Sequence, residues 1–301
     1  MALHIVFHNE LRDTELHDAN APISRRDGLP CASGILRKAA ATILMHLVLF
    51  ALASFFASGL TLFSGFGLGT ILLPVFVLYL PVDTAVALTA IVHLANSLLK
   101  VGFLGRHADR SVALRFGVPA VLAALVGAWA LLSLAKAPPL FSWTLGDRLL
   151  HVEPIKLAVA VLMVAFALLE LSPRFTAWAV PPRWLPVGGA LAGFFGGLSG
   201  HQGSLRTAFL SHCGLTKEAF LGTGVVIACA VDVARLGVYA PRLASGGLAG
   251  HGLKVAVATG AAFLGVWSAN RLLPRVTLRG VRLVVAVALV VLGVAMGVGL
   301  V

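Results

Sequence analysis

The chain is a succession of apolar stretches separated by short polar connections. Because about 20 apolar residues are needed to cross a bilayer as a helix, each long stretch predicts a transmembrane helix. The apolar stretches cover residues 40–62, 67–80, 84–104, 112–135, 154–171, 184–198, 203–213, 218–239, 252–273 and 281–301. Three of them, at 67–80, 184–198 and 203–213, are too short to cross alone and predict half-helices or re-entrant segments. The pattern therefore predicts an all-α polytopic membrane protein with about eight transmembrane helices.

The polar stretches divide the chain into a tail and two transmembrane halves. Residues 1–38 mix acidic and basic side chains, which predicts a flexible cytosolic tail rather than a cleaved signal peptide. The proline-rich stretch 172–186 is the natural connector. It separates a first transmembrane repeat, residues 39–171, from a second, residues 187–301.

The two halves resemble each other at corresponding positions. The matched positions are Gly59 with Gly193, Gly69 with Gly203, Ala85 with Ala219, Thr89 with Thr223, Val92 with Val226, and Gly127-Ala-Trp129 with Gly265-Val-Trp267. They fall in the same order relative to a Gly-rich break, the long span that follows it and the next span. This order predicts an internal repeat, which the sequence leaves open as parallel or inverted.

Each half contains a Gly-rich break inside an apolar segment. The first is Gly65-Phe66-Gly67-Leu68-Gly69, and the second runs from Gly196 to Gly203 through His201 and Gln202. Backbone that leaves the helix at membrane depth is tolerated only beside protein or a watery cavity. Paired breaks in matching halves are typical of transporter binding sites. The sequence therefore predicts a site between the two breaks.

Composition and charge narrow the class of protein. With 59% hydrophobic and 12% charged residues, the chain has too little polar surface for a soluble globule. Its formal charge of +11 comes from Lys and Arg scattered through the connections, where membrane proteins carry them, so nucleic acid is not an expected partner. The three cysteines form no ligand pattern, and neither a metal nor a cofactor is expected.

The basic residues weakly favour a cytoplasmic N-terminus for a protein of the inner or plasma membrane. In that orientation the tail, Arg106, Arg110 and Arg115 lie inside, whereas Lys217 and the arginines between 271 and 282 lie outside.

Arg206 gives the strongest indication of a ligand. An ionisable group at the bilayer centre costs about 2.5–3.5 kcal/mol, so it needs a partner or a wet cavity. Arg206 follows the second break in an apolar half-helix, where free N–H groups also favour an anion. The alternatives are an ion pair with Asp232 and snorkelling to the interface. The bilayer and a small anion are therefore the expected partners, and the oligomeric state stays open.

Two further groups have both a structural and a functional interpretation. Asp232 and Arg235, at i and i+3, predict first an ion pair on one helix; the alternative is that Asp232 accepts a coupling proton. His93 and His201 suit proton coupling because histidine titrates near neutral pH, although packing is the favoured interpretation of His93.

The remaining polar residues of the spans carry weaker indications. Asn96 and Gln202 can donate to an oxyanion or hydrogen-bond between helices. Lys100 lies near the end of a span beside Gly102, and snorkelling is favoured over substrate contact. Glu170 is assigned to the connector.

The first break begins a longer motif that has a degenerate second copy. The motif reads Gly65-x-Gly-x-Gly-(4)-Pro74, then Pro81-(3)-Ala85-(3)-Thr89 and Asn96-Ser97, and its second copy runs from Gly200-x-x-Gly203 through Ala219-(3)-Thr223. This doubled pattern resembles the TauE/SafE family of membrane permeases, also called the sulfite exporter family. The resemblance covers residues 45–300. It implies transport of small sulfur-containing or organic anions, such as sulfite, sulfoacetate or other sulfonates, across the cytoplasmic membrane.

The second copy departs from the usual family pattern. His201 and Gln202 replace expected glycines, Arg206 stands in place of an apolar residue, and Ala208 occupies the position that matches Pro74. These departures leave the substrate open and strengthen the argument for an anion.

The predicted mechanism is alternating access at a site shared by the two breaks. The candidate substrate-binding residues are Gly67, Gly69, Asn96, His201, Gln202, Gly203 and Arg206, and the candidate residues for proton coupling or ion pairing are Asp232, Arg235 and His93. An anion channel is the alternative, although a channel needs no pair of mobile halves. An intramembrane enzyme is disfavoured because the chain has no HExxH, GxSxG or paired-carboxylate motif.

Overall fold

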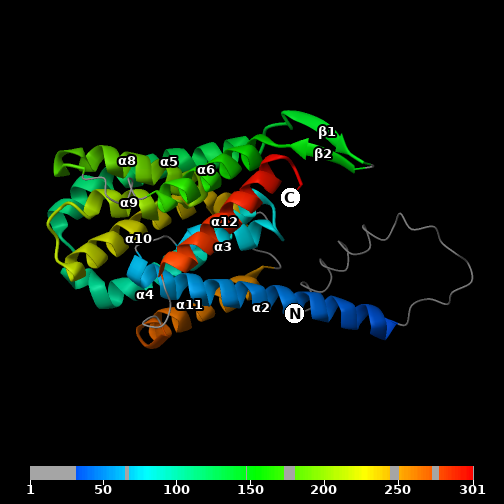
Figure 1. Cartoon of the computed structure of the whole chain (residues 1–301), viewed down its shortest axis with the longest axis horizontal. Helices are drawn as coiled ribbons and strands as arrows, with labels where there is room; N and C mark the ends of the chain where they lie inside the picture. Colours follow the sequence, from blue (N-terminus) through cyan, green and yellow to red (C-terminus); the bar gives the residue numbers. More distant parts are fainter. Residues whose placement is uncertain are drawn as a thin grey trace, which may run out of the picture.

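The structure is a computed structural model that describes residues 32–64, 68–146, 148–172, 180–244, 251–272 and 278–300. These ranges are almost entirely helical, as the apolar pattern predicts (Figure 1). The helices are α2 (Ala32–Ser64), α3 (Leu68–Val77), α4 (Val82–Leu104), α5 (Arg110–Leu134), α6 (Pro154–Leu171), α8 (Leu185–Ser199), α9 (Gly203–Leu210), α10 (Lys217–Arg242), α11 (Gly252–Leu272) and α12 (Leu278–Gly297), with 3₁₀ turns η1 (Gly105–His107) and η2 (Pro182–Trp184). Helix α2 thus begins within the residues assigned to the tail, and residues 1–31 lie outside the described ranges.

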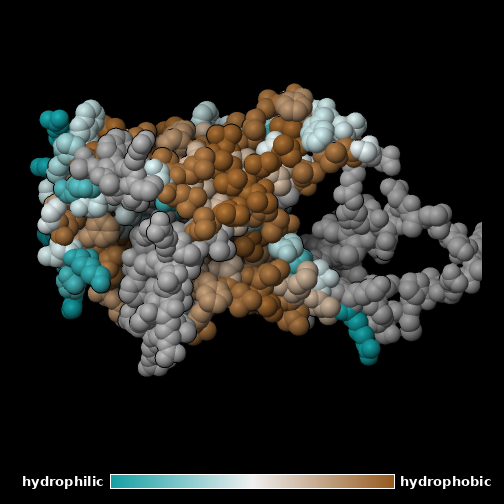
Figure 2. All heavy atoms as spheres, in the orientation of Figure 1, coloured by the Kyte–Doolittle hydropathy of each residue, from teal (hydrophilic) through white to brown (hydrophobic). Residues whose placement is uncertain are grey.

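Several helices have the length and composition of membrane spans. Within the described ranges, five segments qualify: Ala40–Gly59, Val82–His107, Arg110–Leu134, Pro154–Leu171 and Lys217–Arg242. Apolar side chains such as Leu122, Val126 and Leu168 point outward. Figure 2 shows the result as a broad hydrophobic band with hydrophilic residues gathered toward the ends. The three short helices α3, α8 and α9 correspond to the three short apolar stretches, while the total of eight crossings stays a prediction.

The helices pack against one another mainly in pairs, and α10 contacts α5 as extensively as it contacts α4. Helix α5 lies along α8, α2 along α11, α6 along α12, and α4 along α10. The last pair is antiparallel. Asp83 at the start of α4 meets Arg242 at the end of α10, and the backbone N–H of Asp109, after α4, donates to Thr223 Oγ1 near the start of α10 at 2.8 Å.

Glycines bring the α5–α8 pair into backbone contact. Three glycines on α8, spaced one turn apart, form a stripe that faces a matching row of carbonyls on α5. A Cβ at any of these glycines would overlap the carbonyl that it faces. The glycines are Gly189, Gly193 and Gly197, and the carbonyls belong to Phe116, Ala120 and Ala124, in the same order. Since apolar side chains gain nothing by leaving lipid for each other, such close packing is what holds membrane helices together. The α5–α8 contact therefore depends on the absence of side chains along the stripe.

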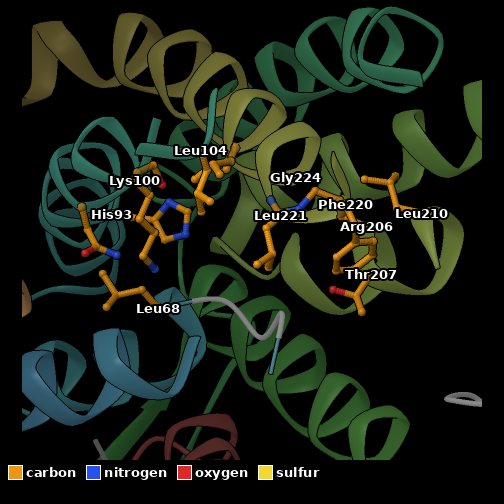
Figure 3. A pocket seen from close by; sticks show the side chains of 14 residues that line it. Leu68, His93, Lys100, Leu104, Arg206, Thr207, Leu210, Phe220, Leu221 and Gly224 are labelled. Atoms are coloured by element: carbon orange, nitrogen blue, oxygen red, sulfur yellow. The ribbon is translucent and has the colours of Figure 1, made fainter. Parts of the chain in front are cut away.

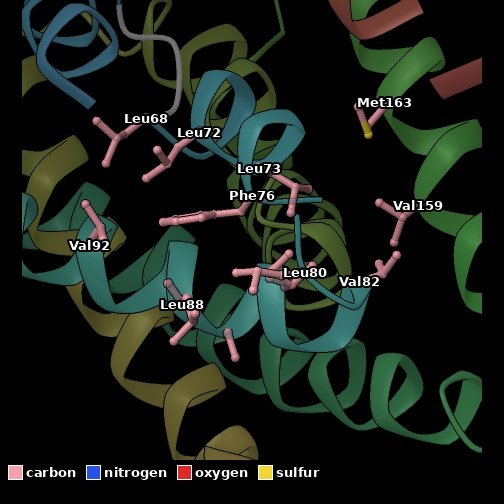
Figure 4. Close-up of a cluster of buried hydrophobic side chains, with 14 of the residues drawn as sticks. Leu68, Leu72, Leu73, Phe76, Leu80, Val82, Leu88, Val92, Val159 and Met163 are labelled. Atoms are coloured by element: carbon pink, nitrogen blue, oxygen red, sulfur yellow. The ribbon is translucent and has the colours of Figure 1, made fainter. Parts of the chain in front are cut away.

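A cluster of buried apolar side chains surrounds α3 and the first half of α4. Leu72, Leu73 and Phe76 of α3 are fully buried and meet Leu88 of α4 (Figure 4). The opposite wall includes Met163 of α6. This cluster fills the space next to the N-terminal half of α4.

A two-stranded hairpin is the element that the sequence analysis missed. Strands β1 (Phe141–Leu145) and β2 (Arg148–Val152) pair antiparallel. The chain turns after β1 at Gly146, whose φ of 62° is readily adopted by glycine. Trp143 Nε1 donates to the carbonyl of Val298 at 2.9 Å, which fixes the hairpin to the end of α12. A Gly-Asp pair flanked by alternating side chains was the available signal.

We expect substitution of Gly193 by valine to loosen the α5–α8 pair. The new side chain would collide with the Ala120 carbonyl, and overpacking of this kind costs about 1–3 kcal/mol. The measurement is thermal unfolding in detergent. Gly260→Val is the matched control, because a Cβ at Gly260 meets nothing within 4 Å. Equal melting temperatures for the two variants would show that the stripe does not hold the helices together.

Candidate functional site

The second break lies where α8 ends and α9 begins. Gly200 terminates α8 with a φ of 83°, a left-handed conformation that glycine adopts without strain. The carbonyls at this end of α8 find donors on α10: Arg235 Nη1 donates to Gly196 O at 3.2 Å, and the Tyr239 hydroxyl donates to Gly197 O. The break is therefore supported by protein, as backbone at membrane depth requires.

The two breaks meet in the interior. A Cβ on Gly69, in the first turn of α3, would lie 3.1 Å from the carbonyl oxygen of Gly200. The remaining residues of the first break, Gly65 to Gly67, lie outside the described residues. Within the described part, the predicted juxtaposition of the two Gly-rich segments is present.

A pocket lies beside this meeting point, between the C-terminal half of α4, α9 and the N-terminal half of α10 (Figure 3). Its empty space of about 590 Å³ includes the open solvent at its mouth. Its lining residues are Leu68, His93, Asn96, Ser97, Lys100, Leu104, Arg206, Thr207, Leu210, Phe220, Leu221, Gly224, Val225 and Ala228. The polar ones come from α4 and α9, whereas α10 supplies an apolar wall.

The polar walls of the pocket are rich in donors. Lys100 is buried on the α4 side, and Arg206 faces it from α9 (Figure 3). Asn96 Oδ1 accepts a hydrogen bond from Ser58 Oγ at 2.8 Å, which leaves the amide nitrogen as the donating end of the side chain. Among the described lining residues there is no Asp or Glu. The pocket is therefore suited to a negatively charged ligand.

A buried charge network lies behind the pocket. Asp232 is fully buried, and its Oδ1 receives Arg235 Nε at 2.9 Å and Gln202 Nε2 at 3.3 Å. Its Oδ2 contacts Nδ1 of His93, whose ring lines the pocket. The ion pair between Asp232 and Arg235 is thus present, and it is held by residues from α4 and from the break as well as by α10.

Gln202 connects this network to the pocket. Its amide nitrogen is directed to Asp232, so its oxygen accepts from Arg206 Nη1, at 3.4 Å. Arg206 therefore reaches Asp232 through Gln202, and no direct ion pair joins the two in the described structure.

The structure separates the predicted site residues into two groups. Arg206, Asn96 and His93 line the pocket. The others lie behind it or at its edge: Gly69, His201, Gln202, Gly203, Asp232 and Arg235, while Gly67 lies outside the described residues.

His201 is fully enclosed behind the pocket. Its Nδ1 lies 3.0 Å from Ser199 Oγ, and its ring stacks on Phe166 with centroids 5.5 Å apart. Its Nε2 has no hydrogen-bond partner among the described residues. The ring therefore packs beside the break and does not line the pocket.

Two side chains differ from the sequence analysis. Lys100, expected to snorkel, is only 8% exposed and lines the pocket. The signal that could have found it is its spacing, since His93, Asn96, Ser97 and Lys100 share one helix face. Glu170, assigned to the connector, is buried on α6 and accepts a hydrogen bond from Ser204 Oγ at the start of α9. Nothing in the sequence indicates this contact, because Glu170 is a single acidic residue at the end of an apolar stretch.

The chain was compared with known proteins. A model of the sulfite exporter TauE/SafE family matches residues 50–296. The chain belongs to this family. It is therefore an integral membrane protein and a membrane transporter, as the Gly-rich motifs predict. No curated protein matches the chain.

We expect loss of the Asp232 charge to destabilise the protein strongly. Asp232→Asn leaves the buried Arg235 guanidinium without its carboxylate, and breaking a buried pair costs about 3–5 kcal/mol. Asp232→Asn/Arg235→Gln should lose less than the single variant, because no buried charge is left uncompensated. Thermal unfolding in detergent measures both.

The matched control is Glu153→Gln, which breaks the partly exposed pair between Glu153 and Lys156 and should change stability by about 0–1 kcal/mol. A double variant as unstable as the sum of its single variants would show that the pair does not act as a unit.

Proposed function

We propose that this transporter carries small anions, in particular sulfur oxyanions or organosulfonates such as sulfite, across the cytoplasmic membrane. The observation that carries the proposal is the donor-rich pocket at the meeting point of the two breaks, with Arg206 in its wall. The guanidinium offers two parallel N–H groups that match two oxygens of an oxyanion. The Asn96 amide and the hydroxyl of Ser97 line the same pocket and provide neutral polar groups for further oxygens.

The helix pairs support a construction from two inverted halves. If α2 to α6 correspond to α8 to α12, the pair α2–α11 corresponds to α8–α5, and the pairs α4–α10 and α6–α12 each map onto themselves. The matched helices α4 and α10 run antiparallel, which is what an inverted repeat requires. The matched glycines Gly127 and Gly265 each face a carbonyl on the partner helix, of Phe194 and Phe55 respectively.

Alternating access is supported by the difference between the two ends of the α4–α10 pair. The pocket lies toward the end of α4 and the start of α10. The other end is filled by the apolar cluster around α3 and bridged by Asp83 and Arg242, whose oxygen and nitrogen are 2.6 Å apart. A channel would need an open path through this end. A carrier needs only that one half moves against the other.

The pocket end is proposed to face the cytoplasm. Arg106 and Arg110 lie there, and the bond between Asp109 and Thr223 places Lys217 at the same end, not on the opposite side as the sequence analysis had it. Because α2 begins at the other end of the molecule (Figure 1), these basic residues give no support to a cytoplasmic N-terminus.

We expect Arg206→Ala to abolish anion binding. The parent protein, in detergent, should show a rise in melting temperature with at least one of sulfite, sulfoacetate or methanesulfonate, because a ligand that binds only the folded state stabilises it. Arg206→Ala should show none. Arg183→Ala removes an exposed arginine and serves as the control.

Binding by Arg206→Ala equal to that of the parent would contradict the proposed site. Substrate-dependent counterflow in proteoliposomes then tests the carrier mechanism, because a pore does not produce it.

Coupling to protons is proposed to act through His93 and Asp232 as a unit. The His93 ring touches both the pocket and Asp232. The charged groups around it are Asp232 and Arg235 on α10, Arg206 on α9 and Lys100 on its own helix. A proton on His93 adds positive charge to the pocket wall, so it favours the bound anion.

We expect transport to increase as the pH on the pocket side falls, and His93→Gln to remove that dependence while anion binding persists. The measurement is uptake of labelled methanesulfonate, whose charge stays constant, into proteoliposomes over a pH series. His107→Gln, at an exposed position in η1, is the control. A pH profile unchanged in His93→Gln would reject the coupling role.

A further inference from the structure

We infer that one end of the pocket is an apolar subsite that holds the organic part of the ligand. The preferred ligand is then a sulfonate with a short, uncharged hydrocarbon chain, rather than an inorganic sulfur oxyanion or a sulfonate whose chain carries a polar group. This inference rests on the proposed function and narrows it, since the anionic group is held by Arg206 in the same pocket.

Four apolar residues from three helices form this apolar end. They are Leu104, the last residue of α4, Leu210, the last residue of α9, and Phe220 and Leu221, near the start of α10 (Figure 3). Because α4 and α10 run antiparallel, the end of α4 meets the start of α10. A Cβ at Gly222 would lie only 2.4 Å from the Leu104 carbonyl oxygen, and Phe220 packs against the buried cluster that contains Leu210. These side chains therefore gather at one end of the pocket.

The anion-binding groups lie deeper in the pocket. A Cβ at Gly224 would lie 3.5 Å from Arg206 Nε, which places this side chain beside Gly224. Gly224 is about one helical turn further along α10 than Leu221, and Asn96 is about two turns before the end of α4. An oxyanion held by Arg206 and Asn96 thus lies roughly 5 Å inside the apolar end. A short chain attached to that oxyanion would extend along Leu221.

The wall that α10 presents is apolar along its whole length. Leu221, Val225 and Ala228 follow the spacing of one helix face, and none of the described lining residues from α10 has a polar side chain. Sulfite and sulfate expose oxygens or a lone pair on every side of the sulfur. Against this wall an oxygen loses its water without gaining a donor, which is unfavourable. A sulfonate places carbon on that side instead, and the same wall then stabilises it.

A polar group on the chain would gain little at this end. The two other polar residues of this part of the pocket, Lys100 and Thr207, are already engaged within the protein. A hydroxyl group on the chain therefore exchanges water for apolar side chains. In contrast, each methylene group that the apolar end buries should raise the affinity about fourfold.

The test compares sulfonates that carry the same charge. Propanesulfonate extends methanesulfonate by two carbons, and isethionate replaces the last carbon of propanesulfonate by a hydroxyl group. Sulfite is the inorganic reference. Apparent dissociation constants are obtained from ligand-dependent melting temperatures of the protein in detergent.

The variants change the polarity of the wall with little change in its shape. Leu221→Asn and Val225→Thr each introduce a polar group, and Leu221→Met keeps the wall apolar. The control is Leu140→Asn, at a residue that is 57% exposed and lies outside the pocket.

The parent and Leu140→Asn should bind propanesulfonate about tenfold more tightly than either methanesulfonate or isethionate, and more tightly than sulfite. Leu221→Asn should reduce the ratio between propanesulfonate and isethionate to about one, and Val225→Thr should reduce it in the same direction. Leu221→Met should retain it. If Leu221→Asn does not fold, Val225→Thr decides the outcome.

Two results would overturn the inference and leave the proposed function standing. The first is a parent that binds sulfite or methanesulfonate at least as tightly as propanesulfonate. The second is a ratio of propanesulfonate to isethionate that the wall variants do not change. A parent that binds neither sulfite nor any of the sulfonates overturns both the inference and the proposed function.

Discussion

The arrangement of the rest of the interior depends on the interactions that compensate the carboxylate of Asp232. A charge buried at membrane depth must be compensated by the protein, and this one is compensated from three directions: by Arg235 on its own helix, by His93 on α4 and by Gln202 in the second break. Each of these partners belongs to a different element. The requirement to satisfy one carboxylate therefore fixes how α4, α10 and the break lie relative to each other.

The same helix also supports the broken backbone. Arg235 and Tyr239 of α10 donate to the carbonyls of Gly196 and Gly197 in the last turn of α8, and the Gly196 carbonyl also accepts the N–H of Gly200. Gly200 then turns the chain, and Gly69 of the other break approaches the Gly200 carbonyl closely because Gly69 carries no side chain. Donors on α10 thus satisfy part of the broken backbone beside the pocket. Its polar wall is thus free to face a ligand.

Much of this arrangement can be predicted from the sequence, because it follows from local rules. The apolar lengths predict the helices, the Gly-rich runs predict the breaks, and the isolated charge of Arg206 in an apolar segment predicts a polar cavity. What could not be predicted depends on which helices are neighbours. The amide of Gln202 could equally have faced a ligand, and only the position of Asp232 directs it away.

Two other differences between the sequence predictions and the structure also depend on how the helices are arranged. Lys100 lies close enough to the end of its span for snorkelling, and only the approach of α9 and α10 turns that position into a pocket wall. Lys217 was placed on the wrong side because a short helix that turns back, rather than crossing, shifts the sidedness of everything after it. Sidedness is a property of the whole chain before a given residue, so a single misjudged segment is enough to invert it.

The two charge contacts between α4 and α10 differ in a way that bears on movement. In the middle of the pair, His93 of α4 contacts the fully buried Asp232 of α10, whereas at the far end the Arg242 side chain is 47% exposed and that of Asp83 is 9% exposed. Ion pairs that are open to water contribute about 0–1 kcal/mol, while breaking a buried pair costs about 3–5 kcal/mol. A motion that opens the far end would admit water to Asp83 as it leaves Arg242, and it would leave the Asp232 network intact. In the proposed alternating access, the central network would therefore stay in place while either end of the helix pair opens.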